Sequence, residues 1–155
     1  MDLITPEIAA ALRANAIANA AGDDRRDPAP VLKLFNPVGA ATWLATELDD
    51  DGDTLFGLAD LGFGCPELGY FSLSEIAAVR LPFGLGIERD LGFASAVPLS
   101  VWADTARRAG SILDAARMLR PVEAHHRARA SSSELPGDPA TGDPDPLPPS
   151  DEDGG

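Results

Sequence analysis

The chain has 155 residues and 45% hydrophobic content, which is the size of one domain with enough apolar material for a single core. Its formal net charge is −13 and Lys33 is its only lysine, which argues against a protein that neutralises nucleic-acid phosphates. No apolar run approaches the roughly 18 residues of a membrane span. The first residues also lack a signal peptide's basic and apolar regions, so we predict a cytoplasmic protein without membrane contact.

The N-terminal segment has the pattern of a helix start. Thr5 is a good N-cap, Pro6 suits the first helical position and Glu7 complements the helix dipole. Gly22 is a suitable C-terminal stop. The helix between them is rich in alanine and weakly apolar, so we expect it to pack at the edge of the domain.

Extended segments rich in β-formers follow. Residues 31–35 alternate and end at a proline, and residues 41–48 and 54–61 flank a turn at 49–53. The last two segments predict an antiparallel hairpin. A Gly-rich loop at 62–66 precedes another strand at 67–71.

Capping signals mark the later helices. Ser72 with Glu75 three residues on fits a capping box, which predicts a short helix over residues 73–80. Ser100 can cap a longer helix that continues to about residue 119, where Pro121 kinks or ends it. Between these helices, residues 87–91 are predicted to form the last strand.

These elements predict one α+β domain over residues 1–130, with a mainly antiparallel sheet of four to five strands and N-terminal, middle and C-terminal helices. Residues 131–155 are mostly Pro, Asp, Gly and Ser, and they carry seven acidic residues without Lys or Arg. Such a segment cannot bury enough surface to offset its backbone entropy. We therefore predict a disordered acidic tail.

Charged residues between positions 47 and 90 are the candidates for a binding site. Carboxylates from several segments could hold Mg²⁺ or Ca²⁺, or act as general acid and base, if they converge. Alternatively, Arg89 forms an ion pair with its neighbours that locks the last strand, or holds an anionic ligand group. The candidate residues are Glu47, Asp60, Glu67, Glu88, Arg89 and Asp90.

Other reactive residues have simpler interpretations. The acidic run at 49–53 is similar to a calcium loop, but its glycine comes too early, so we interpret it as a turn. Cys65, the only cysteine, is interpreted as a small buried residue, because the only histidines, His125 and His126, lie at a solvated helix end. The strand aromatics are interpreted as core. No motif predicts a metal or a cofactor.

Five ordered segments carry a family resemblance: KLFNP at 33–37, ATWLATELD at 41–49, DTLFGL at 53–58, PELGYFSLSE at 66–75 and GIERDLGF at 86–93. They resemble a bacterial domain-of-unknown-function family carried largely on plasmids and other mobile elements, and the likeness covers about residues 3–106. It implies a setting of mobile DNA and antirestriction-type neighbours, and it supplies no reaction. The family's polar positions map onto Lys33, Thr42, Glu47, Asp53, Glu67, Glu75, Glu88, Arg89 and Asp90.

Two functions remain open at this point, and whether the protein is an enzyme is undecided. One is an accessory protein of mobile DNA that uses an acidic face to bind a basic nucleic-acid-handling or host-defence protein, without binding nucleic acid directly. The other is a small metal-assisted hydrolase with clustered carboxylates. A third, simpler hypothesis is a folded module whose acidic residues only aid solubility. Convergence of the carboxylates in a pocket would favour the hydrolase.

Overall fold

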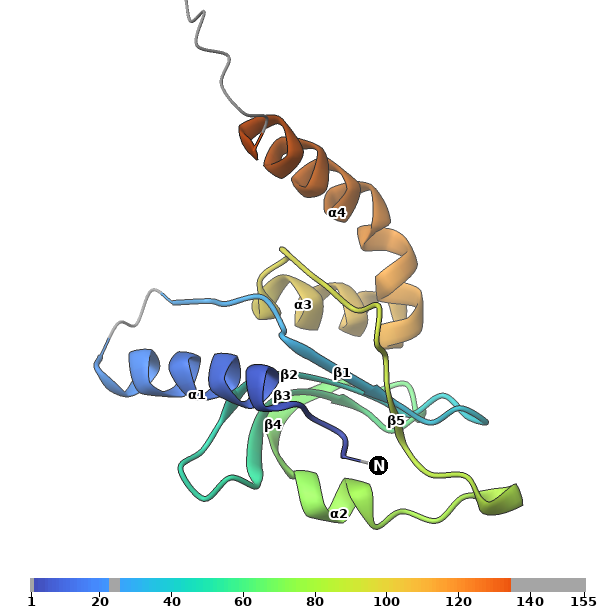
Figure 1. Ribbon diagram of the computed structural model, residues 1–155. Helices are drawn as coiled ribbons and strands as arrows, with labels where there is room; N and C mark the ends of the chain where they lie inside the picture. Colours follow the sequence, from blue (N-terminus) through green and yellow to red (C-terminus); the bar gives the residue numbers. More distant parts are fainter. Residues whose placement is uncertain (1, 23–25, 135–155) are drawn as a thin grey trace, which may run out of the picture.

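The computed structural model describes residues 2–22 and 26–134 as an antiparallel sheet with helices on both faces (Figure 1). The predicted α+β class is confirmed. The elements in chain order are α1 (Pro6–Ala20), β1 (Leu32–Phe35), β2 (Thr42–Leu48), β3 (Thr54–Asp60), β4 (Glu67–Ser72), α2 (Leu73–Ala77), the 3-10 turn η1 (Pro82–Gly84), β5 (Glu88–Arg89), α3 (Leu99–Ala109) and α4 (Ile112–Glu134). Among these residues no helix is long and apolar enough to cross a membrane.

The sheet has the strand order β4-β3-β2-β1-β5, and each neighbouring pair is antiparallel. The predicted hairpin is confirmed as β2 and β3, in which Leu44 lies opposite Leu58. The register of this pair shifts between Ala45 and Glu47, which marks a β-bulge at Thr46. The sheet therefore consists of a β1–β4 meander, with the short strand β5 added beside β1.

Alternate residues of the central strands feed two separate cores. On one face Leu34 and Trp43 pack with Leu12 of α1, and on the other Leu44 and Leu58 pack with α3 and α4. The expectation that α1 packs at the edge is wrong, because α1 lies against the central strand β2 and Leu12 is fully buried. The sheet supplies most of the apolar surface on that face, so a weakly apolar helix suffices.

The predicted helix over residues 100–119 is wrong, because two helices occupy this region. Gly110 ends α3 with a left-handed φ of 90°, and α4 begins two residues later. Pro121 lies inside α4, which continues to Glu134 and is visibly bent (Figure 1). The first four residues of the predicted tail are thus helical, and residues 135–155 lie outside the described residues.

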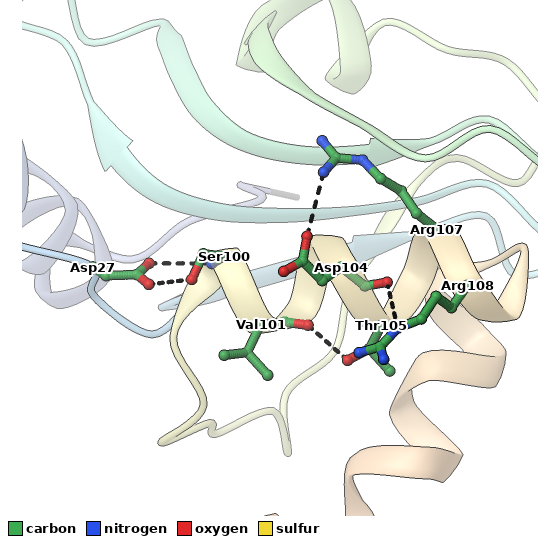
Figure 2. A network of polar contacts seen from close by, with 7 residues as sticks. All are labelled: Asp27, Ser100, Val101, Asp104, Thr105, Arg107 and Arg108. Atoms are coloured by element: carbon green, nitrogen blue, oxygen red, sulfur yellow. Dashed lines mark hydrogen bonds and ion pairs between the residues drawn. The ribbon is translucent and has the colours of Figure 1, made fainter.

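The cap of α3 comes from a distant part of the chain. The helix begins at Leu99, and Pro98 at the N-cap position offers no side-chain acceptor. Asp27 instead accepts hydrogen bonds from the Ser100 amide, at 3.1 Å, and from the Ser100 hydroxyl (Figure 2). The predicted N-cap role of Ser100 is therefore wrong, and Asp27 ties α3 to the segment before β1.

The local caps agree with their sequence signals. The Thr5 hydroxyl accepts the Ile8 amide at 3.2 Å, and the Ser72 hydroxyl accepts the Glu75 amide at 3.2 Å. The second of these starts α2, which ends at Ala77 rather than at the predicted residue 80. Capping patterns within a few residues of sequence were therefore sufficient to locate the helix starts of α1 and α2.

Candidate functional site

The six predicted site residues do not form one cluster. Glu67 belongs to β4 and Glu88 to β5, which are the opposite edges of the sheet. Four strand spacings separate these edges, or about 19 Å. Glu47 lies near the far end of β2 from Thr42, the residue that pairs with Asp60. In the part of the chain that the structure describes, no three His, Cys, Asp or Glu side chains are placed to hold a metal ion.

Asp60 has a structural role. Its side chain is 1% exposed, and its two oxygens accept the amides of Gly62 and Ile112, each at 2.9 Å. The first bond shapes the turn after β3, and the second holds the first residue of α4. This carboxylate has both oxygens engaged by backbone donors.

The charged residues of the last strand also have separate partners. Arg89 donates from Nη1 to the Leu3 carbonyl at 3.0 Å, and Asp90 pairs with Lys33 at 3.5 Å. The expected ion pair of Arg89 with its sequence neighbours is therefore wrong. Arg89 locks the strand through the N-terminal backbone instead, and Glu88 is exposed.

Two residues expected in the core lie at the surface. Cys65 is exposed, because the loop at 62–66 turns outward with left-handed Gly62 and Gly64. Tyr70 lies in β4, and its side chain is nevertheless 74% exposed. His125 and His126 are exposed, as expected, but they lie within α4 and not at its end, because the helix continues to Glu134.

The structure does gather carboxylates at one end of the sheet. We call this group the acidic hairpin end, and it consists of Glu47, Asp49, Asp50, Asp51, Asp53 and Glu75. Most of these residues belong to the β2–β3 turn. Asp53 joins α2 to that turn, because its side chain accepts the Ser72 hydroxyl at 2.6 Å and the Ser74 amide at 2.8 Å. Glu75 is thereby held beside the turn.

Hydrogen bonds keep two of these carboxylates ionised. The hydroxyl of Thr54, then the amides of Thr54 and Asp53, lower the pKa of Asp51 to about 2. The Ser72 hydroxyl and then the Ser74 amide lower the pKa of Asp53. Both groups therefore stay negative under all ordinary conditions, and both are built into the turn.

The β2 bulge exposes backbone groups that α1 binds. Asn15 donates to the Thr46 carbonyl and Arg13 to the Leu48 carbonyl, both at 2.9 Å. One turn further along α1, Asn19 donates to Glu47 Oε1 at 3.4 Å. The bulge thus fixes Glu47 against the end of α1 and turns it towards the hairpin end.

An open groove of about 430 Å³ lies beside Glu47. Asn19, Glu47, Asp49 and Tyr70 contribute its polar and aromatic lining. The Tyr70 ring packs on Phe56 with the ring centroids 5.1 Å apart, and both rings line the groove. Of these groups only Glu47 was singled out from sequence as a site residue, because nothing local to Tyr70 or Asn19 marks them as neighbours.

The fold and this groove define a small α+β domain with carboxylates gathered at one end of its sheet. The chain belongs to a family described as Protein of unknown function (DUF2958), whose pattern matches residues 3–113. No curated protein and no solved structure matched the chain. The match includes the acidic hairpin end and the groove and stops just inside α4.

Proposed function

We propose that this protein is an accessory factor that binds a basic protein partner through the acidic hairpin end. The observation that supports this most strongly is the grouping of six carboxylates on the end of β2, the β2–β3 turn and the start of α2. Arg13 lies close enough for its charge to act on Asp51, but one guanidinium does not balance six carboxylates. The region therefore presents a strong negative field that steers a basic surface towards it.

The groove provides an anchor next to this field. Exposed aromatic rings beside charged groups are typical binding hot spots. A lysine or arginine of the partner that enters the groove meets the Glu47 carboxylate and the Tyr70 ring together, which combines an ion pair with a cation–π contact. Asp49 and Asp50, exposed at the rim, hold further cations by charge.

The sequence resemblance suggests what kind of partner this is. It implies a setting of mobile DNA, in which the proteins that handle nucleic acid carry basic grooves. We therefore propose a nucleic-acid-handling or host-defence protein as the partner class. A metal-assisted hydrolase would need these carboxylates to converge, whereas Asp60 has both oxygens engaged by amides and Glu67 and Glu88 lie on opposite sheet edges.

The proposal is tested by affinity capture from a bacterial lysate, with the double variant D49N/D50N compared with the wild type. Asp49 and Asp50 are exposed, whereas Asp51 and Asp53 hold the turn and are left intact. We expect the wild type to capture proteins of high isoelectric point at about 50 mM salt and to lose them at about 300 mM. The variant should retain less than about a tenth of them, a loss of roughly one tenfold step in affinity.

The matched control is E67Q/E88Q, which removes the same charge from exposed sites elsewhere on the sheet. It should capture as the wild type does, and Y70A should capture less. Equal losses in both double variants would show that only net charge matters, and capture that is indifferent to salt would contradict the electrostatic basis. Either result would reject the proposal.

A further inference from the structure

A second groove, of about 420 Å³, lies between α4 and the segment that follows β5. Its floor is apolar and its α4 wall is basic. We call it the α4 groove, and the lining residues that matter here are Phe93, Ala94, Ala96, Arg120, His126 and Arg127. It is separate from the acidic hairpin end, with which it shares no lining residue.

The acidic side chains of this groove are already satisfied. Glu123 accepts the Ser95 hydroxyl at 2.5 Å and the Ala96 amide at 3.1 Å, and Ser95 is held in turn by the Trp102 indole at 3.0 Å. Asp90 pairs with Lys33 and accepts the Gly92 amide at 3.0 Å. Asp90 is thus balanced by Lys33. Glu123 is turned towards Ser95 and Ala96 and offsets part of the positive charge of the α4 wall, which keeps an excess of one arginine.

Arg120 and Arg127 have no ion pair or side-chain hydrogen bond among residues 2–22 and 26–134. They lie seven residues apart, which is two turns of a helix, so both guanidiniums rise from the same side of α4. A ligand that suits this groove therefore combines apolar groups for the floor with negative charge for the two arginines of the wall.

The chain itself carries such a segment directly after α4. Residues 135–155 hold six acidic residues and no Lys or Arg, and the acidic end Asp151-Glu152-Asp153 follows the apolar stretch Pro146-Leu147-Pro148-Pro149. An apolar stretch followed by adjacent carboxylates complements an apolar floor beside two arginines. Proline-rich chain also loses less conformational freedom on ordering than most sequences do.

The length of the chain permits this contact. Arg127 and Arg120 lie seven and fourteen residues before Glu134, or about 10 and 21 Å along a helix. Asp151 lies seventeen residues beyond Glu134, and a chain of that length spans up to about 56 Å. Because both parts belong to one molecule, the effective concentration of the segment at the groove is in the millimolar range.

We propose that residues 146–153 fold back and occupy the α4 groove of the same molecule. Leu147 covers the floor at Phe93, and the carboxylates at 151–153 pair with Arg120 and Arg127. Both halves of this contact, the basic wall on α4 and the acidic segment, lie outside the residues 3–113 that match the family. The contact thus adds to the family domain, and the bound segment competes with other anionic ligands for the groove.

A spin label on the segment tests the proposal in the full-length chain. Ser150→Cys is made in a Cys65→Ser background, since Cys65 is the only native cysteine and is exposed. We expect the amide signals of residues 93–96 and 120–127 to lose at least half their intensity in the labelled protein. The loss should disappear at about 500 mM salt, and in the variant R120Q/R127Q.

The matched control is R107Q/R108Q, which removes two exposed arginines of α3 that do not line the groove. It should leave the signal loss unchanged. Mixing labelled chains with isotope-enriched unlabelled chains separates contact within a molecule from contact between molecules. Signal loss in the mixture, loss at other surfaces, or no loss at all would each overturn the proposal.

Discussion

Asp60 and Glu67 are carboxylates seven residues apart in the sequence, and both were candidates for the same site. The fold buries Asp60 against two amides and leaves Glu67 exposed at the start of an edge strand. Sequence proximity and residue type therefore do not distinguish a structural carboxylate from a free one. The amide donor of Ile112, 52 residues away, makes the difference.

This contrast predicts that Asp60→Asn lowers the free energy of unfolding by about 2 to 3 kcal/mol, because an NH₂ donor then faces a buried amide donor. Urea denaturation followed by circular dichroism measures the change. Glu67→Gln, the exposed counterpart, should stay within about 0.5 kcal/mol of the wild type. An Asp60→Asn protein as stable as the Glu67→Gln protein would contradict the structural role assigned to Asp60.

Exposure was the least predictable property of single residues. Cys65 and Tyr70 belong to types that are usually buried or half-buried, and both lie at the surface here. Cys65 is exposed because its glycine-rich loop projects outward, and Tyr70 because its ring borders the open groove beside Glu47. Both causes are properties of the assembled sheet rather than of the residue.

At the scale of elements, the strands, the hairpin and two caps could be predicted because their signals lie within a few residues. The cap of α3 could not, because Asp27 is 73 residues away from Ser100. The break at Gly110 could not be predicted, because apolar residues recur at helical spacing on both sides of it, from Trp102 to Ala116. The groove beside Glu47 was missed because it needs the β2 bulge and the end of α1 together.

The β2–β3 pair depends on a glycine at one position. A Cβ on Gly57 would lie 1.8 Å from the Leu44 carbonyl oxygen, whereas a Cβ on its neighbour across the sheet, Gly69, would have nothing within 4 Å. We predict that Gly57→Ala destabilises the protein by about 3 kcal/mol, because backbone must shift. Gly69→Ala should be nearly neutral, and thermal unfolding compares the two. Equal melting temperatures would show that the strands can separate without cost.

At the scale of the whole molecule, the folded unit is longer than the family match. The match ends at residue 113, but Ala115 and Leu119 of α4 are buried in the core shared with α3 and the sheet. The helix that closes this core thus belongs to the domain although most of it lies outside the shared pattern. The predicted domain of residues 1–130 stays a prediction.

We predict that a chain of residues 1–134 unfolds cooperatively and within about 1 kcal/mol of the full-length protein. A chain of residues 1–113 should be at least about 3 kcal/mol less stable, because it loses the buried Leu119 side chain and exposes its contacts. Chemical denaturation of the two chains gives the comparison. A stable chain of residues 1–113 would mean that α4 contributes no core.

The bond between Arg89 and the Leu3 carbonyl has a consequence for synthesis on the ribosome. It joins groups 86 residues apart, and β5 likewise pairs with β1, from which β2, β3 and β4 separate it in the sequence. The β1–β4 meander needs only neighbouring segments, so it can form as soon as it leaves the exit tunnel. The Leu3 carbonyl can therefore bind Arg89 only after β5 has emerged, which is later than the pairing of β1 to β4.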